Sequence, residues 1–438
     1  MRAVETIKNI WKIEDLRNRI LTTLLLVAIY RFGTYVVLPG IDPKALTALQ
    51  EQTRGGLLAL LDMFSGGAFS NASIFALGIM PYISASIVMQ LMAIAVPSFQ
   101  KLQREGESGR RKINQWTRYL TVAILLFQGP TYLVNLSVQL KAAGAALPAG
   151  IWFTISSTVI LAAGSMFILW LGERITDKGV GNGISIVLLI NIISGMPSDF
   201  ATLYSTFVAP KTPAKGVLAA VIILAILIVM VVLVCFLQDG ERRIPVQYSQ
   251  KVSGRRTVGG QSTNIPLKVN TAGVMPIIFA SSLMQFPVII AQLFGKSYEW
   301  TRYLSSSYWC RVEAPKYSIG LLVYIVLLII FAYFYTSITF NPIEVADNLK
   351  KAGGVIPGIT PGKSTSEYLN KILNYIVFIG AVGLLIIALI PIMCTGFFNA
   401  SVSFGGTSII IIVGVVLETL KQIESQMCNR YYKGFLSE

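Results

Sequence analysis

The sequence has no histidine, and only 13% of its 438 residues are charged, where a soluble chain has about a quarter. The absence of histidine removes the commonest general base and the commonest metal ligand. The four cysteines stand far apart without CxxC spacing, which argues against a disulfide framework and a thiolate metal site. Hydrophobic residues make up 54% of the chain. These proportions exclude a soluble enzyme, a disordered protein and a coiled coil. They predict an all-α polytopic membrane protein with no catalytic site, cofactor or metal.

Apolar stretches long enough to cross a bilayer recur along the whole chain. A membrane-spanning helix needs about 20 mostly apolar residues. The interval between Lys371 and Glu418 carries no charge and must hold two such helices. We predict ten transmembrane helices, at residues 20–38, 74–96, 119–138, 151–171, 180–197, 216–238, 271–293, 318–340, 373–393 and 405–424.

The basic residues alternate between the two sides of these predicted spans. Of 36 Lys and Arg, 26 fall in the N-terminal tail, the even-numbered loops and the C-terminal end, and 9 fall in the odd-numbered loops. Because Lys and Arg collect on the cytoplasmic side of membrane proteins, both termini are predicted to be cytoplasmic. Residues 1–19 are predicted to form an amphipathic interfacial helix, and residues 425–438 a cytoplasmic tail. Most of the formal net charge of +15 therefore reflects topology.

An internal repeat predicts the architecture. Residues 78–90 (GIMPYISASIVMQ) and 273–285 (GVMPIIFASSLMQ) are identical at eight of thirteen positions. They lie in the second and seventh predicted spans, so an odd step of five spans separates them and they run in opposite directions. We therefore predict two inverted five-helix halves, residues 20–200 and 201–424, with a pathway at their interface.

The predicted spans hold few ionisable residues, with Arg31 near the start and Glu418 near the end. Proton- or ion-coupled transporters use intramembrane carboxylates or histidines, so a secondary transporter for a small solute is weakened as an alternative without being excluded. A membrane-embedded hydrolase or lipid transferase lacks a histidine base and paired intramembrane acids. Ile79, Ile83 and Ile87 lie four apart on one helix face. That spacing fits either ordinary helix packing or an apolar constriction that closes by dewetting.

The segment before the second span has an unusual length. Thirty-eight uncharged residues separate Asp62 from Lys101, too many for one span and too few for two. Its first part, residues 63–70, is interrupted by two glycines. Irregular backbone is tolerated at membrane depth only where protein surrounds it. We interpret this part as a short re-entrant or plugging segment.

Two predicted cytoplasmic loops, residues 239–270 and 341–372, are longer than a helix connection requires. Both carry basic residues, which either mark topology or dock an acidic or RNA-containing partner. Docking is the better interpretation because the loops are long and their basic residues are paired. The basic residues are Arg242, Arg243, Lys251, Arg255, Arg256 and Lys268 in the first loop, and Lys350, Lys351, Lys363 and Lys371 in the second.

Six motifs in order along nearly the whole chain carry a family resemblance. They are SIFALGIMPYISASI (73–87), EGESGRRK (105–112), GVGNGISI (179–186), PLKVNTAGVMP (266–276), FNPIEVADNLKKAGG (340–354) and FGGTS (404–408). With these motifs the chain resembles the SecY family, the large subunits of the bacterial Sec translocon. The resemblance implies a passive protein-conducting channel in the bacterial cytoplasmic (inner) membrane. Unfolded secretory chains cross such a channel, and membrane segments leave it sideways.

The resemblance also implies site residues. The pore ring corresponds to Ile79, Ile83, Ile184, Leu188, Ile278 and Ile411. The plug corresponds to Leu60, Leu61, Asp62, Met63, Phe64, Ser65, Gly66, Gly67, Ala68, Phe69 and Ser70. A lateral gate between the second and third and the seventh and eighth spans would be held shut by hydrogen bonds among Ser84, Gln128 and Asn270.

The implied partners are SecE-like and SecG-like small membrane subunits, the SecA motor ATPase, the ribosome, signal-sequence-bearing polypeptides and membrane lipids. The motor or the ribosome would supply the driving force. One position departs from the family pattern: the usual GIRPG stretch is here 358–362, with Thr360 in place of arginine. Threonine cannot make the charged contacts of arginine, and our hypothesis is that Lys363 makes them instead.

Overall fold

The computed structural model describes residues 13–41, 62, 64–105, 107–142, 148, 150–208, 213–248, 251–253, 256–258, 262–271, 273–293, 299–304, 309–310, 315–398 and 406–433. The α-helices are α2 (Glu14–Gly33), α5 (Met80–Ala95), α6 (Pro97–Arg104), α7 (Glu107–Ala142), α8 (Ile151–Lys178), α9 (Gly183–Leu203), α10 (Pro213–Asp239), α11 (Met275–Leu293), α12 (Glu299–Leu304), α13 (Ile319–Thr339), α14 (Pro342–Lys351), α15 (Lys363–Phe398) and α16 (Gly406–Lys433). The strands are β1 (Glu241–Tyr248), β2 (Lys251–Ser253), β3 (Arg256–Val258), β4 (Ser262–Lys268) and β5 (Gly354–Val355).

Each of the ten predicted spans overlaps one helix of this fold, in chain order α2, α5, α7, α8, α9, α10, α11, α13, α15 and α16. Within the described residues, six of these (α7, α8, α9, α10, α13 and α15) are long and apolar enough to cross a membrane. Helices α5 and α11 are apolar but shorter. The structure is therefore a mostly helical bundle with several candidate spans, and the count of ten stays a prediction.

Some helices extend well beyond the predicted intervals. Helices α7 and α15 each have 36 residues, a length of about 54 Å at the usual rise of an α-helix. Hydropathy detects only the apolar part of such a helix, because the turns outside the bilayer can be polar. This explains why charged residues at the start of α7, such as Arg110 and Arg111, fell outside the predicted span.

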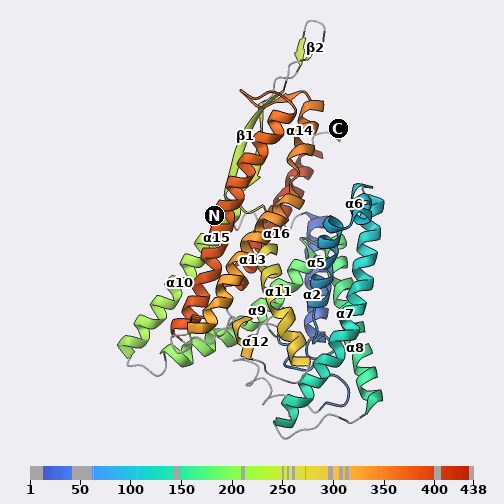
Figure 1. The fold of residues 1–438 in the computed structure, drawn as a ribbon, viewed down its shortest axis with the longest axis vertical. Helices are drawn as coiled ribbons and strands as arrows, with labels where there is room; N and C mark the ends of the chain where they lie inside the picture. The colour runs from blue at the N-terminus through green and yellow to red at the C-terminus, as the bar shows by residue number, and fades with distance from the viewer. Residues whose placement is uncertain are drawn as a thin grey trace.

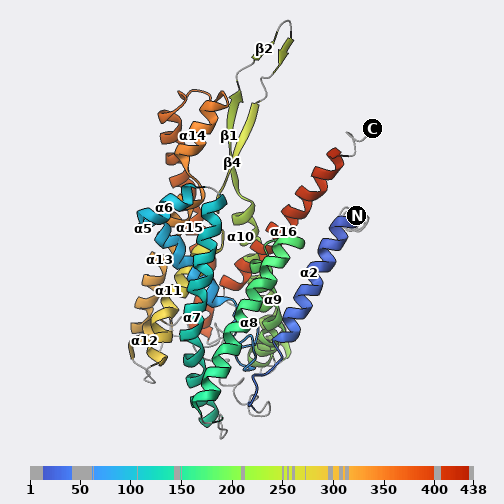
Figure 2. The same ribbon diagram turned by 90° about the vertical axis from the view of Figure 1, so that its right-hand side faces the viewer.

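The elements are arranged along one long axis (Figure 1). Strand β1 and helix α14 lie toward one end, and the α6 end of α5, the start of α2 and the end of α16 point in the same direction (Figure 2). Helix α12 lies at the other end (Figures 1 and 2). Helix α5 leads to α6, whereas α11 follows β4 and leads toward α12, so α5 and α11 run in opposite directions (Figures 1 and 2).

The two long loops contain strands, which the prediction of a helical membrane protein did not include. Strand β1 pairs antiparallel with β4, from Glu241↔Lys268 to Gln247↔Ser262, and its end pairs with β5 at Tyr248↔Gly354. Strands β2 and β3 form a separate antiparallel pair. In β1 the inward residues Ile244 and Val246 alternate with exposed neighbours. Only two inward apolar residues mark this strand, so its period-two pattern was too short to recognise among the charges.

Candidate functional site

The repeated segments start their helices in the same way. Gly78 (φ +57°) and Gly273 (φ +62°) both have left-handed backbone, a conformation that favours glycine. Each donates its N–H to the carbonyl three residues earlier, at 2.9 and 3.3 Å. Helices α5 and α11 then begin at Met80 and Met275, again 195 residues apart, each with proline as its second residue. The sequence repeat is thus also a repeat of local structure.

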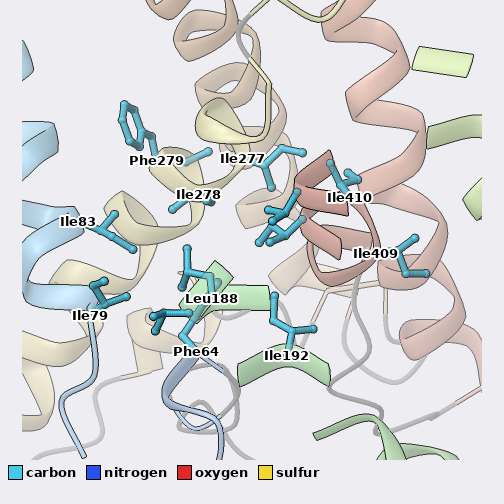
Figure 3. Close-up of a cluster of buried hydrophobic side chains, with 14 of the residues drawn as sticks. Phe64, Ile79, Ile83, Leu188, Ile192, Ile277, Ile278, Phe279, Ile409 and Ile410 are labelled. Carbon is cyan, nitrogen blue, oxygen red and sulfur yellow. The ribbon is translucent and has the colours of Figure 1, made fainter. Parts of the chain in front are cut away.

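The six predicted ring residues share one hydrophobic cluster. Five of them are buried, namely Ile79, Ile83, Leu188, Ile278 and Ile411, and Ile184 packs against them half-buried. They come from the start of α5 and from α9, α11 and α16. Figure 3 shows Ile79 and Ile83 on one side, Ile278 beside them and Leu188 between them and the residues of α16. The six residues thus lie in one cluster. Their role as a pore ring stays a prediction.

The cluster also includes buried residues outside the six predicted ring positions, such as Phe64, Ile192 and Ile410 (Figure 3). Ile192 continues the four-residue spacing of Ile184 and Leu188, as Ile87 continues that of Ile79 and Ile83. That spacing would have found Ile192. Phe64 belongs to the predicted plug, and its burial among ring residues could not be foreseen from any periodicity.

The described part of the predicted plug is Asp62 and residues 64–70, while Leu60, Leu61 and Met63 lie outside the described residues. Asp62, Phe64 and Ser65 are helical, and residues 66–70 form tight turns. Its own side chains bind it together: Ser65 Oγ accepts the N–H of Phe69 at 3.0 Å. The Asp62 carboxylate accepts the N–H and the hydroxyl of Ser70 at 2.9 and 3.1 Å.

Polar side chains from the surrounding helices bind the plug backbone. Asn191 Nδ2 donates to the Phe64 carbonyl at 2.6 Å, and the Tyr132 hydroxyl donates to the Phe69 carbonyl at 2.8 Å. Arg31 Nη1 donates to the Gly66 carbonyl at 2.7 Å. Arg31 lies in the first predicted span, and its partner could not be predicted from the sequence. Such contacts join a side chain to a distant main-chain atom, so they leave no signal in the sequence.

Gly66 cannot carry a side chain at its position. It has φ +66°, and a Cβ there would lie 2.6 Å from Asn191 Oδ1. One of the two glycines noted in the plug is therefore required by both backbone conformation and close approach.

The predicted gate residues are only partly assembled. Asn270 is buried, with Ser84 on α5 and Gln128 on α7 half-buried. Helices α7 and α11 are in contact, yet the described residues include no hydrogen bond between any two of these three side chains. Asn270 Nδ2 is buried without a hydrogen-bond partner. An unpaired buried donor costs about 1–3 kcal/mol, so it favours a rearrangement that supplies an acceptor.

The two long loops fold into one unit, which the sequence did not reveal. Residues of β1, β4, α14 and α15, with the residue that follows β5, share a hydrophobic cluster of Ile244, Val246, Leu267, Leu349, Ile356, Leu369, Ile372 and Ile376. We call these two loops the docking unit. Its described basic side chains are all exposed, namely Arg242, Arg243, Lys268, Lys350, Lys351, Lys363 and Lys371. The side chains of Lys251, Arg255 and Arg256 lie outside the described residues.

The position that departs from the GIRPG pattern lies on the surface of the docking unit. Thr360 is exposed, and its carbonyl accepts a hydrogen bond from Thr365 Oγ1 at 2.9 Å. Lys363 begins α15 and is 92% exposed, with its Nζ 4.0 Å from Glu367 Oε1. An exposed ion pair of this length is weak and leaves the ammonium available to a partner.

The sequence model of the SecY family matches residues 73–420. The protein translocase subunit SecY of Streptomyces scabiei is 45% identical over 436 residues, covering 97% of this chain and 98% of that protein. The chain belongs to the SecY family. The SecY subunit of Escherichia coli K12 is 39% identical over 424 residues, covering 97% of this chain and 94% of the relative.

Solved structures share the SecY fold with this chain. One, described as showing that the SecY plug domain stabilises the closed state of the translocation channel, has a TM-score of 0.60 and 16% identity. The match covers 94% of this protein and 92% of the chain in that solved structure. Sec61 in the canine ribosome–channel complex has a TM-score of 0.55 and 16% identity, with the same coverage. At this identity the structures show a common fold.

Proposed function

We propose that this chain is the channel subunit of a bacterial protein translocase. It moves unfolded secretory proteins across the cytoplasmic membrane and releases membrane segments sideways into the bilayer. The SecY family membership over nearly the full chain supports this function. The pore is passive, and SecA or a translating ribosome supplies the force.

The observation that carries the proposal is the apolar cluster in which the six ring residues meet. Its members come from α5, α9, α11 and α16, so each predicted half contributes. A narrow apolar constriction excludes water and ions by dewetting. Branched aliphatic side chains also offer a passing polypeptide no hydrogen bond to retain it. The same ring therefore seals the resting channel and lets an unfolded chain slide.

The proposed topology is ten spans in two inverted halves with both termini in the cytoplasm. The opposite directions of α5 and α11 support the inversion (Figures 1 and 2). Strand β1 and helix α14 lie toward one end, and the α6 end of α5, the start of α2 and the end of α16 point the same way (Figures 1 and 2), which supports a common cytoplasmic side. Those are the elements to which the Lys and Arg excess belongs.

The lateral gate in this proposal opens between α5 and α7 on one side and α11 and α13 on the other. Asn270 lies five residues before the start of α11, and its unpaired amide gives the gate a buried donor. A signal sequence that separates the helices changes the surroundings of that donor. The free energy cost of the unpaired Asn270 amide therefore depends on whether the gate helices are together or apart.

The docking unit is the proposed site for SecA and the ribosome. Its exposed basic side chains suit ribosomal RNA phosphates and acidic protein surfaces. The structural relative Sec61, solved in a ribosome–channel complex, supports the ribosome as a partner. SecE-like and SecG-like subunits and lipids complete the assembly around the helices, and Lys363 is the proposed substitute for the missing arginine.

Crosslinking from the ring tests this function. A preprotein with one cysteine is stalled in the reconstituted channel, in a variant without native cysteines. We expect a disulfide from Ile83→Cys and none from Val221→Cys on the exposed face of α10. Equal crosslinking from both positions, or none from Ile83→Cys, would contradict passage through the ring.

A further inference from the structure

Three plug carbonyls each accept a hydrogen bond from a different helix. The donors are Asn191 on α9 to Phe64, Arg31 on α2 to Gly66, and Tyr132 on α7 to Phe69, at 2.6, 2.7 and 2.8 Å. Ser194 adds a longer contact of 3.4 Å to the Gly66 carbonyl. All these bonds go to main-chain atoms, so they depend on where the plug backbone lies.

Asn191 is at the centre of this arrangement. It is 0% exposed, and its Oδ1 accepts the Tyr30 hydroxyl at 2.7 Å while its Nδ2 donates to Phe64. Tyr30 is also 0% exposed. When the plug leaves, the Asn191 amide loses its acceptor inside an apolar cluster. Because an unmade buried hydrogen bond is costly, this amide opposes departure of the plug.

Contacts with Tyr35 orient the Arg31 guanidinium toward the Gly66 carbonyl. The guanidinium lies over the Tyr35 ring, 5.2 Å from the centroid, and donates to the Tyr35 hydroxyl at 3.3 Å. A cation aimed at a carbonyl makes a stronger hydrogen bond than a neutral donor.

The polar contacts are asymmetric between the predicted halves. The hydrogen bonds from Arg31, Tyr132, Asn191 and Ser194 to the plug backbone come from α2, α7 and α9, which all lie in the first half. The link to α11 and α16 is apolar and runs through the cluster that includes Phe64. The apolar contacts between the plug and these two helices can separate without leaving unpaired polar groups.

We propose that Tyr30, Arg31, Tyr132 and Asn191 form a latch that keeps the plug on the first half. The plug then stays attached while the two halves separate, and it leaves only when the latch itself breaks. Gate opening and plug release are two steps with separate barriers. This inference rests on the proposed channel function and on the plug assignment.

Ion conductance in planar bilayers tests the latch, using the channel purified with its membrane subunits and no translocating substrate. Asn191→Leu removes both bonds at the centre, and we expect the resting leak to rise about tenfold. Arg31→Met should raise the leak less, because it removes one contact of a side chain that is only half-buried. Arg118→Met is the matched control: it breaks the exposed pair with Glu173 and should leave the leak unchanged.

Deletion of residues 60–70 distinguishes the latch proposal from the plug assignment. We expect the deletion to leak and Asn191→Leu to add nothing in that background, because its target is gone. A leaking deletion with tight Asn191→Leu and Arg31→Met channels would overturn the latch and leave the plug assignment standing. An equal added leak in both backgrounds would also overturn the latch. A tight deletion channel would overturn the plug assignment on which the latch rests.

Discussion

Asn191 and Asn270 are both buried amides, but the structure satisfies only one of them fully. Asn191 bonds on both sides, whereas Asn270 Nδ2 has no partner. At the scale of single residues, the family resemblance pointed to Asn270 and missed Asn191. The family resemblance supplied the predicted ring residues, whereas the four-residue spacing of Ile79 and Ile83 by itself fits ordinary helix packing equally well. The latch could not be predicted, since Tyr30 and Asn191 are 161 positions apart.

Replacing Ile278 with asparagine should open the ring to water. An amide in the apolar cluster would destabilise the closed ring by about 1–3 kcal/mol unless water reaches it. We expect a higher resting conductance in planar bilayers. Leu188→Ile is the matched control, because a swap of equal volume in the same cluster should keep the seal. A tight Ile278→Asn channel would show that this cluster is packing and not the seal.

Replacing Asn270 with leucine should stabilise the described arrangement. The change removes an unpaired buried donor, and we expect a shift of about 1 kcal/mol toward the closed gate. Translocation of substrates with weak signal sequences should therefore fall, while strong signals are little affected. Faster translocation of the weak substrates would contradict the direction argued from the unpaired amide.

At the scale of elements, the helices were easier to predict than the loops. Long apolar runs located a helix for every predicted span, and the repeat located the starts of α5 and α11. The docking unit escaped prediction because β1 pairs with β5, more than one hundred positions further along the chain. Its cluster is completed by α15, a helix whose apolar run was interpreted only as a membrane span.

Replacing Lys363, whose side chain is 92% exposed, with alanine tests the docking unit. If its charge replaces the missing arginine, motor-driven translocation should fall about two- to fivefold, the range expected for one exposed charge contact. Initial rates with purified SecA measure this. Lys316→Ala, an exposed lysine just before α13, is the matched control and should have no effect. An unchanged rate for Lys363→Ala would exclude the substitution hypothesis.

At the scale of the whole molecule, the account requires that α12 and the segment leading to α13 face away from the cytoplasm. Cys310 lies in that segment, and burial raises the pKa of its thiol. Its thiolate fraction is therefore small at neutral pH, and alkylation should accelerate by about tenfold per pH unit below that pKa. A membrane-impermeant maleimide should label Cys310 from outside intact cells. Labelling only from the cytoplasmic side would contradict the predicted topology.

The most direct test of the central claim is import of an unfolded preprotein into vesicles that contain the purified channel with its membrane subunits. With SecA and ATP outside, the account predicts that the preprotein becomes protected from added protease, and that protection is lost without ATP. A purified protein that gives no protection but drives counterflow of a radiolabelled small solute would contradict the account. The isoleucine cluster would then be the packed core of a transporter.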